Sequence, residues 1–192
     1  MIFLSAGHLN TRNLKHKTDP GAVGVNGRWE ADEAVKIRDR VTAILVSKGY
    51  NVINDGPQET LREYLARIKP GPASVVLEYH FDAAANATGT STLVGDNSGK
   101  TSQNMAAELT KSTSDILGIK LRDGGDGDMI IFEKDSHRGR LGLMREAGTV
   151  GLHEVCFISN PNDMAAFDDP IKFEALCQAH ASILGKFEDL IK

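Results

Sequence analysis

The chain has 192 residues, of which 41% are hydrophobic and 25% are charged, and its formal net charge is −4. This composition is that of an ordinary globular protein, and the length suits one hydrophobic core, so we expect residues 1–192 to form a single domain. The negative charge argues against nucleic acid as a partner, because binding to the phosphate backbone needs a basic surface.

The apolar segments are too short for a membrane-spanning helix, which needs roughly 20 apolar residues. The first residues, Met1-Ile-Phe-Leu-Ser-Ala-Gly7, place no basic residue ahead of a short apolar run and do not resemble a secretory signal. We therefore expect no membrane insertion, and synthesis in the cytoplasm without a signal peptide. Cys156 and Cys177 both lie in apolar patterns, which favours free thiols over a disulfide.

Apolar runs typical of buried strands alternate along the chain with helical patterns. The strand-like runs are residues 2–6, 51–54, 74–81, 90–94, 129–132 and 149–157. The helical patterns are residues 30–48, 59–68, 102–117, 138–147 and 170–191, the last with Asp169 as N-cap and Pro170 at its first position. Because strands with apolar residues on both faces belong inside a sheet, this pattern predicts an α/β fold with a mostly parallel sheet and helices on both faces.

Metal-binding side chains stand at the ends of three of these elements. His8 follows the first strand directly, Glu30 opens the first long helix, and His80 ends the third strand. Taken singly, each has an ordinary interpretation: a polar loop residue for a histidine, and a first-turn acid favoured by the helix dipole for Glu30. Ligands of parallel sheets, however, bind at the carboxyl ends of the strands. Two imidazoles and one carboxylate at that edge are a known ligand set for catalytic zinc, with a fourth position open for water.

Glu154 lies within the last apolar strand, where an ionised carboxylate is costly unless it is paired or functional. Its neighbour His153 must point to the opposite face, because side chains alternate along a strand. Only one of the two can therefore face the metal. The zinc-protease helix motif is excluded, since it needs a second histidine four residues further on.

The sequence resembles the zinc-dependent N-acetylmuramoyl-L-alanine amidases, which cleave the bond between muramic acid and the peptide in bacterial cell walls. The resemblance extends over nearly the whole chain. It is carried by blocks in the family's order, which are Ala6-Gly7-His8, Asp19-Pro-Gly-Ala22 followed by Gly24, Asn26, Gly27 and Glu30, Leu61-Arg62, His80, and Glu154-Val-Cys-Phe-Ile-Ser-Asn160-Pro. The resemblance implies a roughly six-stranded α/β catalytic domain, His8, Glu30 and His80 as zinc ligands, and Glu154 as the catalytic glutamate.

The resemblance also implies the reaction, which is zinc-dependent hydrolysis of the amide bond between N-acetylmuramic acid and L-alanine. Zn²⁺ is then the cofactor, peptidoglycan the partner, and we expect a monomer. The setting that this implies is that of a phage-type endolysin, which acts on the cell wall after release. Two alternatives stay open: a zinc peptidase or deacylase of similar fold, and a catalytically weak wall-binding module that keeps the fold.

The sequence departs from the family's common pattern in two places. Residues 9–18 separate His8 from Asp19, where many members have only a few residues, and we expect this insertion to cover the cleft or contact glycan. Glu78 and Asp82 stand where the family commonly has small polar residues. We expect them to support His80, with a change in the ligand set as the alternative.

Overall fold

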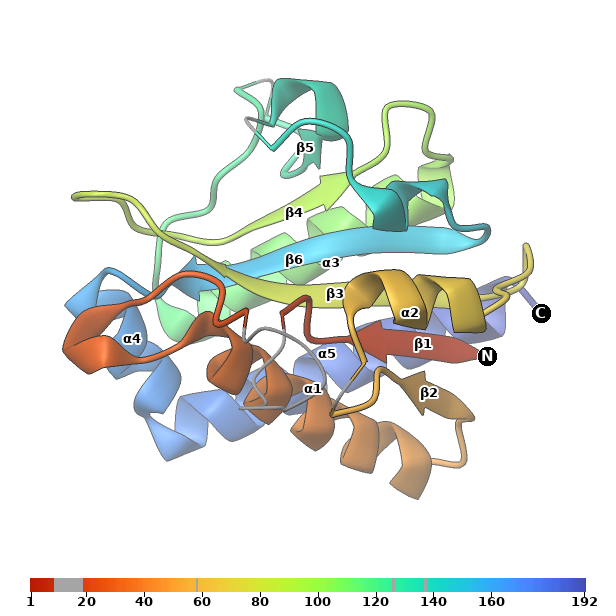
Figure 1. Ribbon diagram of the computed structural model, residues 1–192, viewed down its shortest axis with the longest axis horizontal. Helices are drawn as coiled ribbons and strands as arrows, with labels where there is room; N and C mark the ends of the chain where they lie inside the picture. The colour runs from red at the N-terminus through yellow and green to blue at the C-terminus, as the bar shows by residue number, and fades with distance from the viewer. Residues whose placement is uncertain (9–18, 58, 126, 137) are drawn as a thin grey trace.

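The computed structural model describes residues 1–8, 19–57, 59–125, 127–136 and 138–192. Within these ranges six strands form one sheet, namely β1 (Ile2–Ser5), β2 (Val52–Asn54), β3 (Val75–Asp82), β4 (Ser91–Val94), β5 (Ile131–Phe132) and β6 (Thr149–Phe157). Their order is β2-β1-β3-β6-β4-β5 (Figure 1). The pairs among β2, β1, β3 and β6 are parallel, β4 is antiparallel to β6, and β5 is parallel to β4. This topology confirms the predicted mostly parallel, six-stranded α/β fold.

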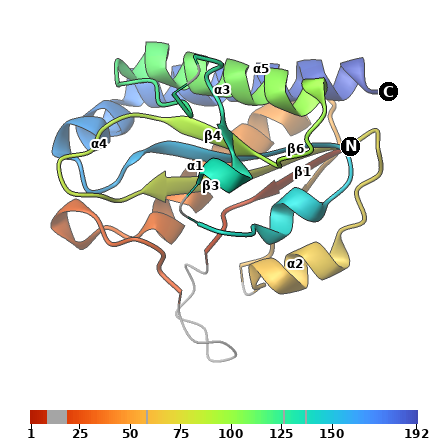
Figure 2. The ribbon, with the colours of Figure 1, turned by 90° about the horizontal axis from the view of Figure 1, so that it is seen from above.

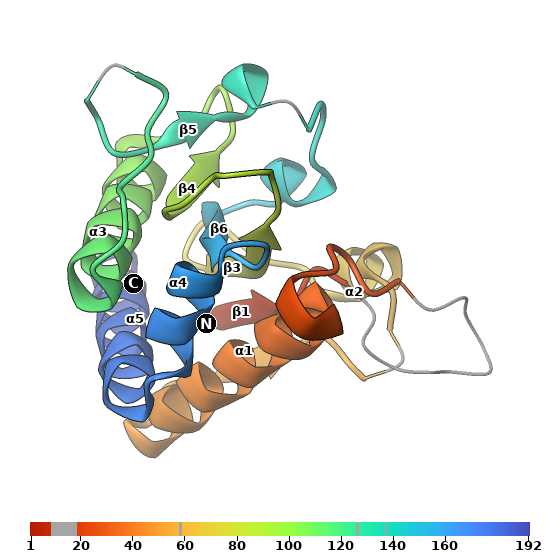
Figure 3. The same ribbon diagram turned by 90° about the vertical axis from the view of Figure 1, so that its left-hand side faces the viewer.

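Helices cover both faces of the sheet, as predicted. One face carries α1 (Glu30–Ser47), α3 (Lys100–Leu117) and α5 (Pro170–Leu190), whereas α2 (Leu61–Arg67) lies on the other (Figure 3). Seen from above, α3 and α5 run side by side (Figure 2). The short helix α4 (Pro161–Asp168) follows β6 and packs against α5.

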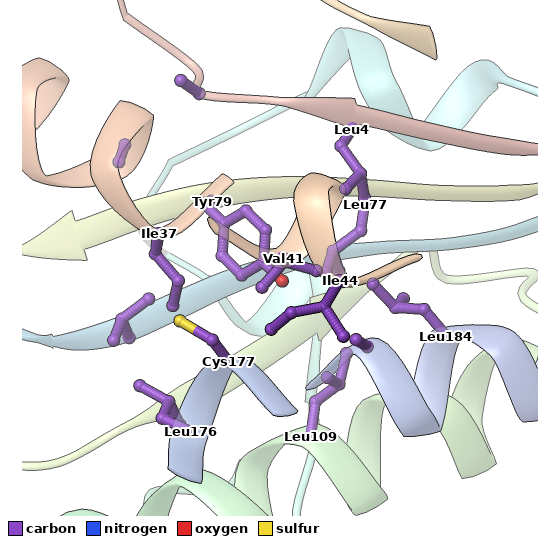
Figure 4. Close-up of a cluster of buried hydrophobic side chains, with 14 of the residues drawn as sticks. Leu4, Ile37, Val41, Ile44, Leu77, Tyr79, Leu109, Leu176, Cys177 and Leu184 are labelled. Carbon is purple, nitrogen blue, oxygen red and sulfur yellow. The ribbon is translucent and has the colours of Figure 1, made fainter. Parts of the chain in front are cut away.

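Alternation along the strands divides the core between the two faces. On β3, Val75, Leu77, Tyr79 and Phe81 join the larger cluster beneath α1, α3 and α5, whereas Val76 joins the smaller cluster beneath α2. In the larger cluster, side chains of α1 and α5 meet around the sheet residues (Figure 4). Cys156 and Cys177 are both buried and free, which confirms the expected thiols.

The predicted helix over 138–147 is wrong. This segment contains only the short 3-10 turn η3 (Gly142–Arg145), and Gly139 has φ 69°, a left-handed conformation that interrupts a helix. The structure also contains α4, which the sequence analysis missed although its start signals are clear. The side chain of Asn160 accepts hydrogen bonds from two backbone N–H groups, and Pro161 is the first helical residue.

The insertion over residues 9–18 lies outside the described residues, so its expected role in covering the cleft stays a prediction. None of the described helices combines the length and apolar character needed to cross a membrane.

Candidate active site

The structure brings the three predicted metal ligands together at one edge of the sheet. His8 follows β1, Glu30 is the first residue of α1, and His80 lies near the end of β3. One donor atom from each side chain lies within 4.8 Å of the other two. Nδ1 of His80 is 2.7 Å from Oε1 of Glu30, and Nε2 of His8 is 3.4 Å from the same oxygen. The strand ends therefore converge as the parallel topology requires.

Two glycines allow the loops to approach this closely. Gly7 has φ 67°, and a Cβ atom at this position would overlap the ring of His80. Gly21 has φ 66°, and a Cβ there would lie 2.5 Å from the carboxylate of Glu30 and 2.6 Å from the ring of His8. Both positions combine a left-handed backbone with no room for a side chain, and only glycine meets both conditions without strain.

A carboxylate also contacts the second nitrogen of each imidazole. Nδ1 of His8 lies 3.1 Å from Asp19, and Nε2 of His80 lies 2.9 Å from Glu78. The other oxygen of Glu78 accepts a hydrogen bond from the hydroxyl of Ser5 at 2.9 Å. Metal-binding histidines commonly donate their remaining N–H group to a carboxylate, which fixes the orientation of the ring. This arrangement leaves Nε2 of His8 and Nδ1 of His80 available for a cation.

Backbone groups hold the carboxylate of Glu30 in place. Its Oε2 accepts a hydrogen bond from the N–H of Ala22 at 2.7 Å, and its Oε1 accepts one from the N–H of Phe81 at 3.0 Å. The first of these donors lies in the Asp19–Ala22 motif and the second lies next to His80. The side chain of Glu30 therefore connects the loop around Ala22, the start of α1 and the end of β3.

The charges of this edge favour a bound cation. Glu30, Glu78 and Glu154 are only 3%, 2% and 1% exposed, and buried carboxylates require compensating positive charge. Burial acts to lower the pKa of His80, but hydrogen bonds to Glu30 and Glu78 outweigh it and raise that pKa to about 10. Burial acts to raise the pKa of Glu30, but hydrogen bonds to His8 and His80 outweigh it and lower that pKa. The carboxylates of this edge therefore stabilise positive charge, as a bound cation would supply.

The residues present fit zinc. Two imidazoles and one carboxylate are three ligands of a catalytic zinc site, and their second hydrogen bonds already orient them. Asp82, one of the two unusual carboxylates, does not join this group. It lies 3.0 Å from Arg122 and 3.5 Å from Arg138, so of the two only Glu78 contacts a predicted ligand.

Glu154 lies on β6 directly opposite His80 in the strand register and on the same face of the sheet. Burial raises the pKa of its carboxyl group to about 7, although His80 and Arg138 act in the opposite direction. Nη2 of Arg138 lies 2.6 Å from the carboxylate. Neither carboxylate oxygen has a hydrogen bond of good geometry to a described residue. Arg138 was not identified from the sequence, because it reaches Glu154 from a loop that carries no motif.

Comparisons with known proteins agree with this geometry. The model of the N-acetylmuramoyl-L-alanine amidase family matches residues 2–186. Among solved structures, a Neisseria meningitidis protein assigned as an N-acetylmuramoyl-L-alanine amidase is 30% identical over 96% of this chain and 93% of its own, with a TM-score of 0.69. A search of the curated proteins returned no significant match.

More distant structures share the fold. The catalytic domain of CwlV, an N-acetylmuramoyl-L-alanine amidase from Bacillus (Paenibacillus) polymyxa var. colistinus, is 19% identical over 98% of this chain and 97% of its own, with a TM-score of 0.73. The N-acetylmuramoyl-L-alanine amidase from Clostridium difficile 630 is 18% identical over 98% of this chain and 96% of its own, also with a TM-score of 0.73. Because the family model covers nearly the whole chain, the chain belongs to the N-acetylmuramoyl-L-alanine amidase family of peptidoglycan amide hydrolases.

Proposed function

We propose that this amidase is zinc-dependent and hydrolyses the bond between the lactyl group of N-acetylmuramic acid and L-alanine. One observation carries the proposal: His8, Glu30 and His80 each place a donor atom within 4.8 Å of the others, and Glu154 lies opposite His80 on the adjacent strand. Three protein ligands are the usual number for a catalytic zinc site, which keeps one position open for chemistry.

In this proposal Glu154 moves the proton. When bound, zinc supplies a Lewis acid that polarises the carbonyl group and makes water more acidic. Glu154 takes a proton from the attacking water and then delivers it to the nitrogen of L-alanine, because an amide anion is too basic to leave unprotonated. The C–N bond breaks, and the products are a carboxylic acid on the glycan and a free amine on the peptide. Burial raises the pKa of Glu154 to about 7, which suits a group that must both accept and release a proton.

The other residues of the site hold the reacting groups. Asp19 and Glu78 orient the two imidazoles, and the backbone N–H groups of Ala22 and Phe81 orient the carboxylate of Glu30. Arg138 pairs with the ionised form of Glu154 and limits how far burial raises its pKa.

The substitution Glu154→Gln tests this function. It should slow hydrolysis by on the order of a hundredfold or more while leaving one zinc ion per chain, because the ligands are unchanged. Activity is measured on purified peptidoglycan as new peptide amines, and zinc content by mass spectrometry. A variant with wild-type activity would contradict the role of Glu154.

The products of the same peptidoglycan digest distinguish the amidase from the two alternative functions. An amidase releases peptide amines without creating new reducing sugar ends. A zinc peptidase shortens the peptides, and a wall-binding module releases nothing. A relative at 30% identity and the match of the amidase family model to residues 2–186 support the amidase.

The proposal includes the biological setting. The protein is synthesised in the cytoplasm, acts as a monomer, and lyses the wall after release, as a phage-type endolysin does. Support comes from the substrate, which lies outside the cell membrane. Expression in a bacterium should leave the culture turbid until the membrane is permeabilised. Sedimentation should give the mass of a single chain.

A further inference from the structure

We propose that Asp55 and Arg38 position His8 for metal binding, although neither residue is itself a metal ligand. Asp55 directly follows β2, Arg38 lies on α1, and His8 lies shortly after β1. A small cavity with a volume of about 120 Å³ has all three residues in its lining, so the pair lies beside this ligand. The inference rests on the proposed function, because it concerns how a zinc ligand is held in place.

The turn that carries His8 is attached to the edge of the sheet through Asp55. Within the turn, the N–H of His8 donates to the carbonyl oxygen of Ala6 at 2.7 Å, and Gly7 has φ 67°. The N–H of Ala6 donates to Oδ2 of Asp55 at 3.2 Å. The backbone N–H of Asp55 donates to the carbonyl oxygen of Leu4, also at 3.2 Å. Asp55 therefore holds the backbone at two points directly before the turn.

This attachment depends on a side chain because the pairing of β2 with β1 stops before the turn. β2 is the edge strand beside β1 (Figure 1), and their register ends with Leu4 opposite Asn54. Beyond this pair, the carboxylate of Asp55 replaces a backbone carbonyl group as the acceptor for Ala6. Ala6 is fully buried, and a buried backbone N–H group without an acceptor is costly. The turn should therefore lose its fixed position when this acceptor is removed.

Arg38 fixes the carboxylate of Asp55. Nη1 of Arg38 lies 2.5 Å from Oδ1 of Asp55, while the other oxygen of this carboxylate accepts from Ala6. The same guanidinium group donates to Asp39 at 2.7 and 2.9 Å. The side chains of Arg38 and Asp55 are only 8% and 9% exposed, so water competes little for their contact. Because removal from water costs such a pair much of its attraction, we attribute to it a role in geometry rather than in net stability.

The contact between Arg38 and Asp55 connects His8 to the helix that carries a second ligand. Glu30 is the first residue of α1, and Arg38 lies about two turns further along the same helix. The helix fixes the position of Arg38 relative to Glu30, and the ion pair extends this constraint to the turn. Nε2 of His8 and Oε1 of Glu30 lie 3.4 Å apart, close enough to bind one ion. Loss of Asp55 should therefore release His8 and leave the other two ligands in place.

The experiment is a double-mutant cycle on zinc affinity, measured by competition with a chromogenic chelator. Asp55→Ala should raise the zinc dissociation constant by about 10- to 100-fold, as expected when a group that orients a ligand is lost. His8→Ala should raise it at least as much. In the His8→Ala background, Asp55→Ala should have no additional effect, because it acts through His8. Asp55→Asn, whose amide oxygen can still accept from Ala6, should retain most of the affinity.

Two control substitutions separate positioning from a general loss of stability. Arg40→Met removes an arginine of the same helix that pairs with Glu174 on the surface. Leu109→Ala creates a cavity in the larger core cluster and should lower the melting temperature. Both should keep the zinc affinity of the wild type. Bound Co²⁺ gives a second readout, because its visible absorption depends on its ligands and geometry: the spectrum of Asp55→Ala should approach that of His8→Ala, whereas the spectra of the controls should match the wild type.

Three results would overturn the inference: equal zinc affinity in Asp55→Ala and the wild type, a further loss when Asp55→Ala is added to His8→Ala, or an equal loss of affinity in Leu109→Ala. If Asp55→Ala does not fold, Arg38→Met provides the same cycle with a smaller expected effect, about 3- to 10-fold. Failure of the proposed function has a different signature, since the wild type itself would then bind no zinc or, when loaded with zinc, would leave the muramoyl-L-alanine bond uncleaved.

Discussion

Two histidine clusters lie back to back on the same pair of strands. In the register of β3 and β6, His80 is opposite Glu154, and one position earlier Tyr79 is opposite His153. Because side chains alternate along a strand, the first pair faces α2 and the second faces α3 and α5. The two clusters lie on the same two strands, but their side chains contact different partner groups.

The cluster that faces the helices α3 and α5 is neutral. His153 contacts the hydroxyl groups of Thr92 at 2.8 Å and Thr113 at 3.0 Å, and His180 contacts Thr113 at 2.8 Å and Tyr79 at 3.3 Å. Burial lowers the pKa of His180 to about 3. Burial, together with the neighbouring His180, also lowers the pKa of His153. These imidazoles join strands and helices through hydrogen bonds and carry no charge at neutral pH.

The cluster at the sheet edge behaves in the opposite way. There the partners are carboxylates, and the pKa of His80 is raised to about 10, because hydrogen bonds to Glu30 and Glu78 outweigh its burial. Burial is therefore common to both clusters, and the partner groups decide whether the pKa of the histidine is raised or lowered. Carboxylates create a place for a cation, whereas hydroxyl groups create a neutral polar core.

The largest contrast between the clusters should appear in zinc binding. His80→Ala should weaken zinc affinity by about a thousandfold or more, because one of three ligands is lost. His153→Gln is the matched substitution on the opposite face of the same strand pair, and it should keep one zinc ion per chain. Metal content after dialysis against a weak chelator measures both. Equal zinc retention by the two variants would show that the two histidine clusters do not differ in metal binding.

Loss of the Glu78 carboxylate, which contacts Nε2 of His80, should have a smaller effect on zinc binding. Glu78→Gln should weaken zinc binding by about 10- to 100-fold, because the imidazole loses the charged acceptor that orients it. The change is measured as a zinc dissociation constant by competition with a chromogenic chelator. Asp82→Asn is the control, since Asp82 contacts arginines rather than a ligand. If Glu78→Gln instead abolishes zinc binding altogether, Glu78 is itself a ligand.

The smallest effect concerns acid stability. The folded pKa of His180 is about 3, below its model value of 6.5, so the unfolded chain takes up protons below about pH 6.5 before the folded chain does. Titration of His180 should therefore leave the free energy of unfolding unchanged above pH 6.5. It should fall below pH 6.5 by about 1.4 kcal/mol per pH unit for each buried neutral histidine.

Urea unfolding at pH 7.5 and pH 5.5 measures this loss. His180→Gln removes one titrating group, so its free energy of unfolding should depend less on pH than that of the wild type. An unchanged pH dependence would show that His180 is not held neutral in the folded protein. In the metal-free protein the raised pKa of His80 has the opposite sign: its contribution is present below pH 6.5 and is lost as the pH rises toward 10.

The sequence predicted the elements whose signals are local. Apolar runs located the strands, and Asp169 with Pro170 marked the start of α5, where the Asp169 side chain accepts hydrogen bonds from two backbone N–H groups. The helix predicted over 138–147 does not form, because Gly139 adopts a left-handed conformation and glycine at 139 and 142 is unfavourable inside a helix.

The residues of the candidate site that lie on or directly after strands could be predicted from the sequence. His8 and His80 end adjacent parallel strands, and alternation showed that only one of His153 and Glu154 could face the site, whereas the family resemblance indicated Glu154. Arg138 was not predictable, because it reaches Glu154 from a loop that carries no motif.

X-ray absorption at the zinc edge of protein loaded with one zinc ion per chain tests the proposed ligand set most directly. Coordination by His8, Glu30 and His80 should give nitrogen and oxygen ligands at about 2.0–2.1 Å, imidazole scattering from two histidines, and no sulfur at about 2.3 Å. Zinc bound through sulfur, or through fewer than two imidazoles, would contradict the claim that His8, Glu30 and His80 hold the metal.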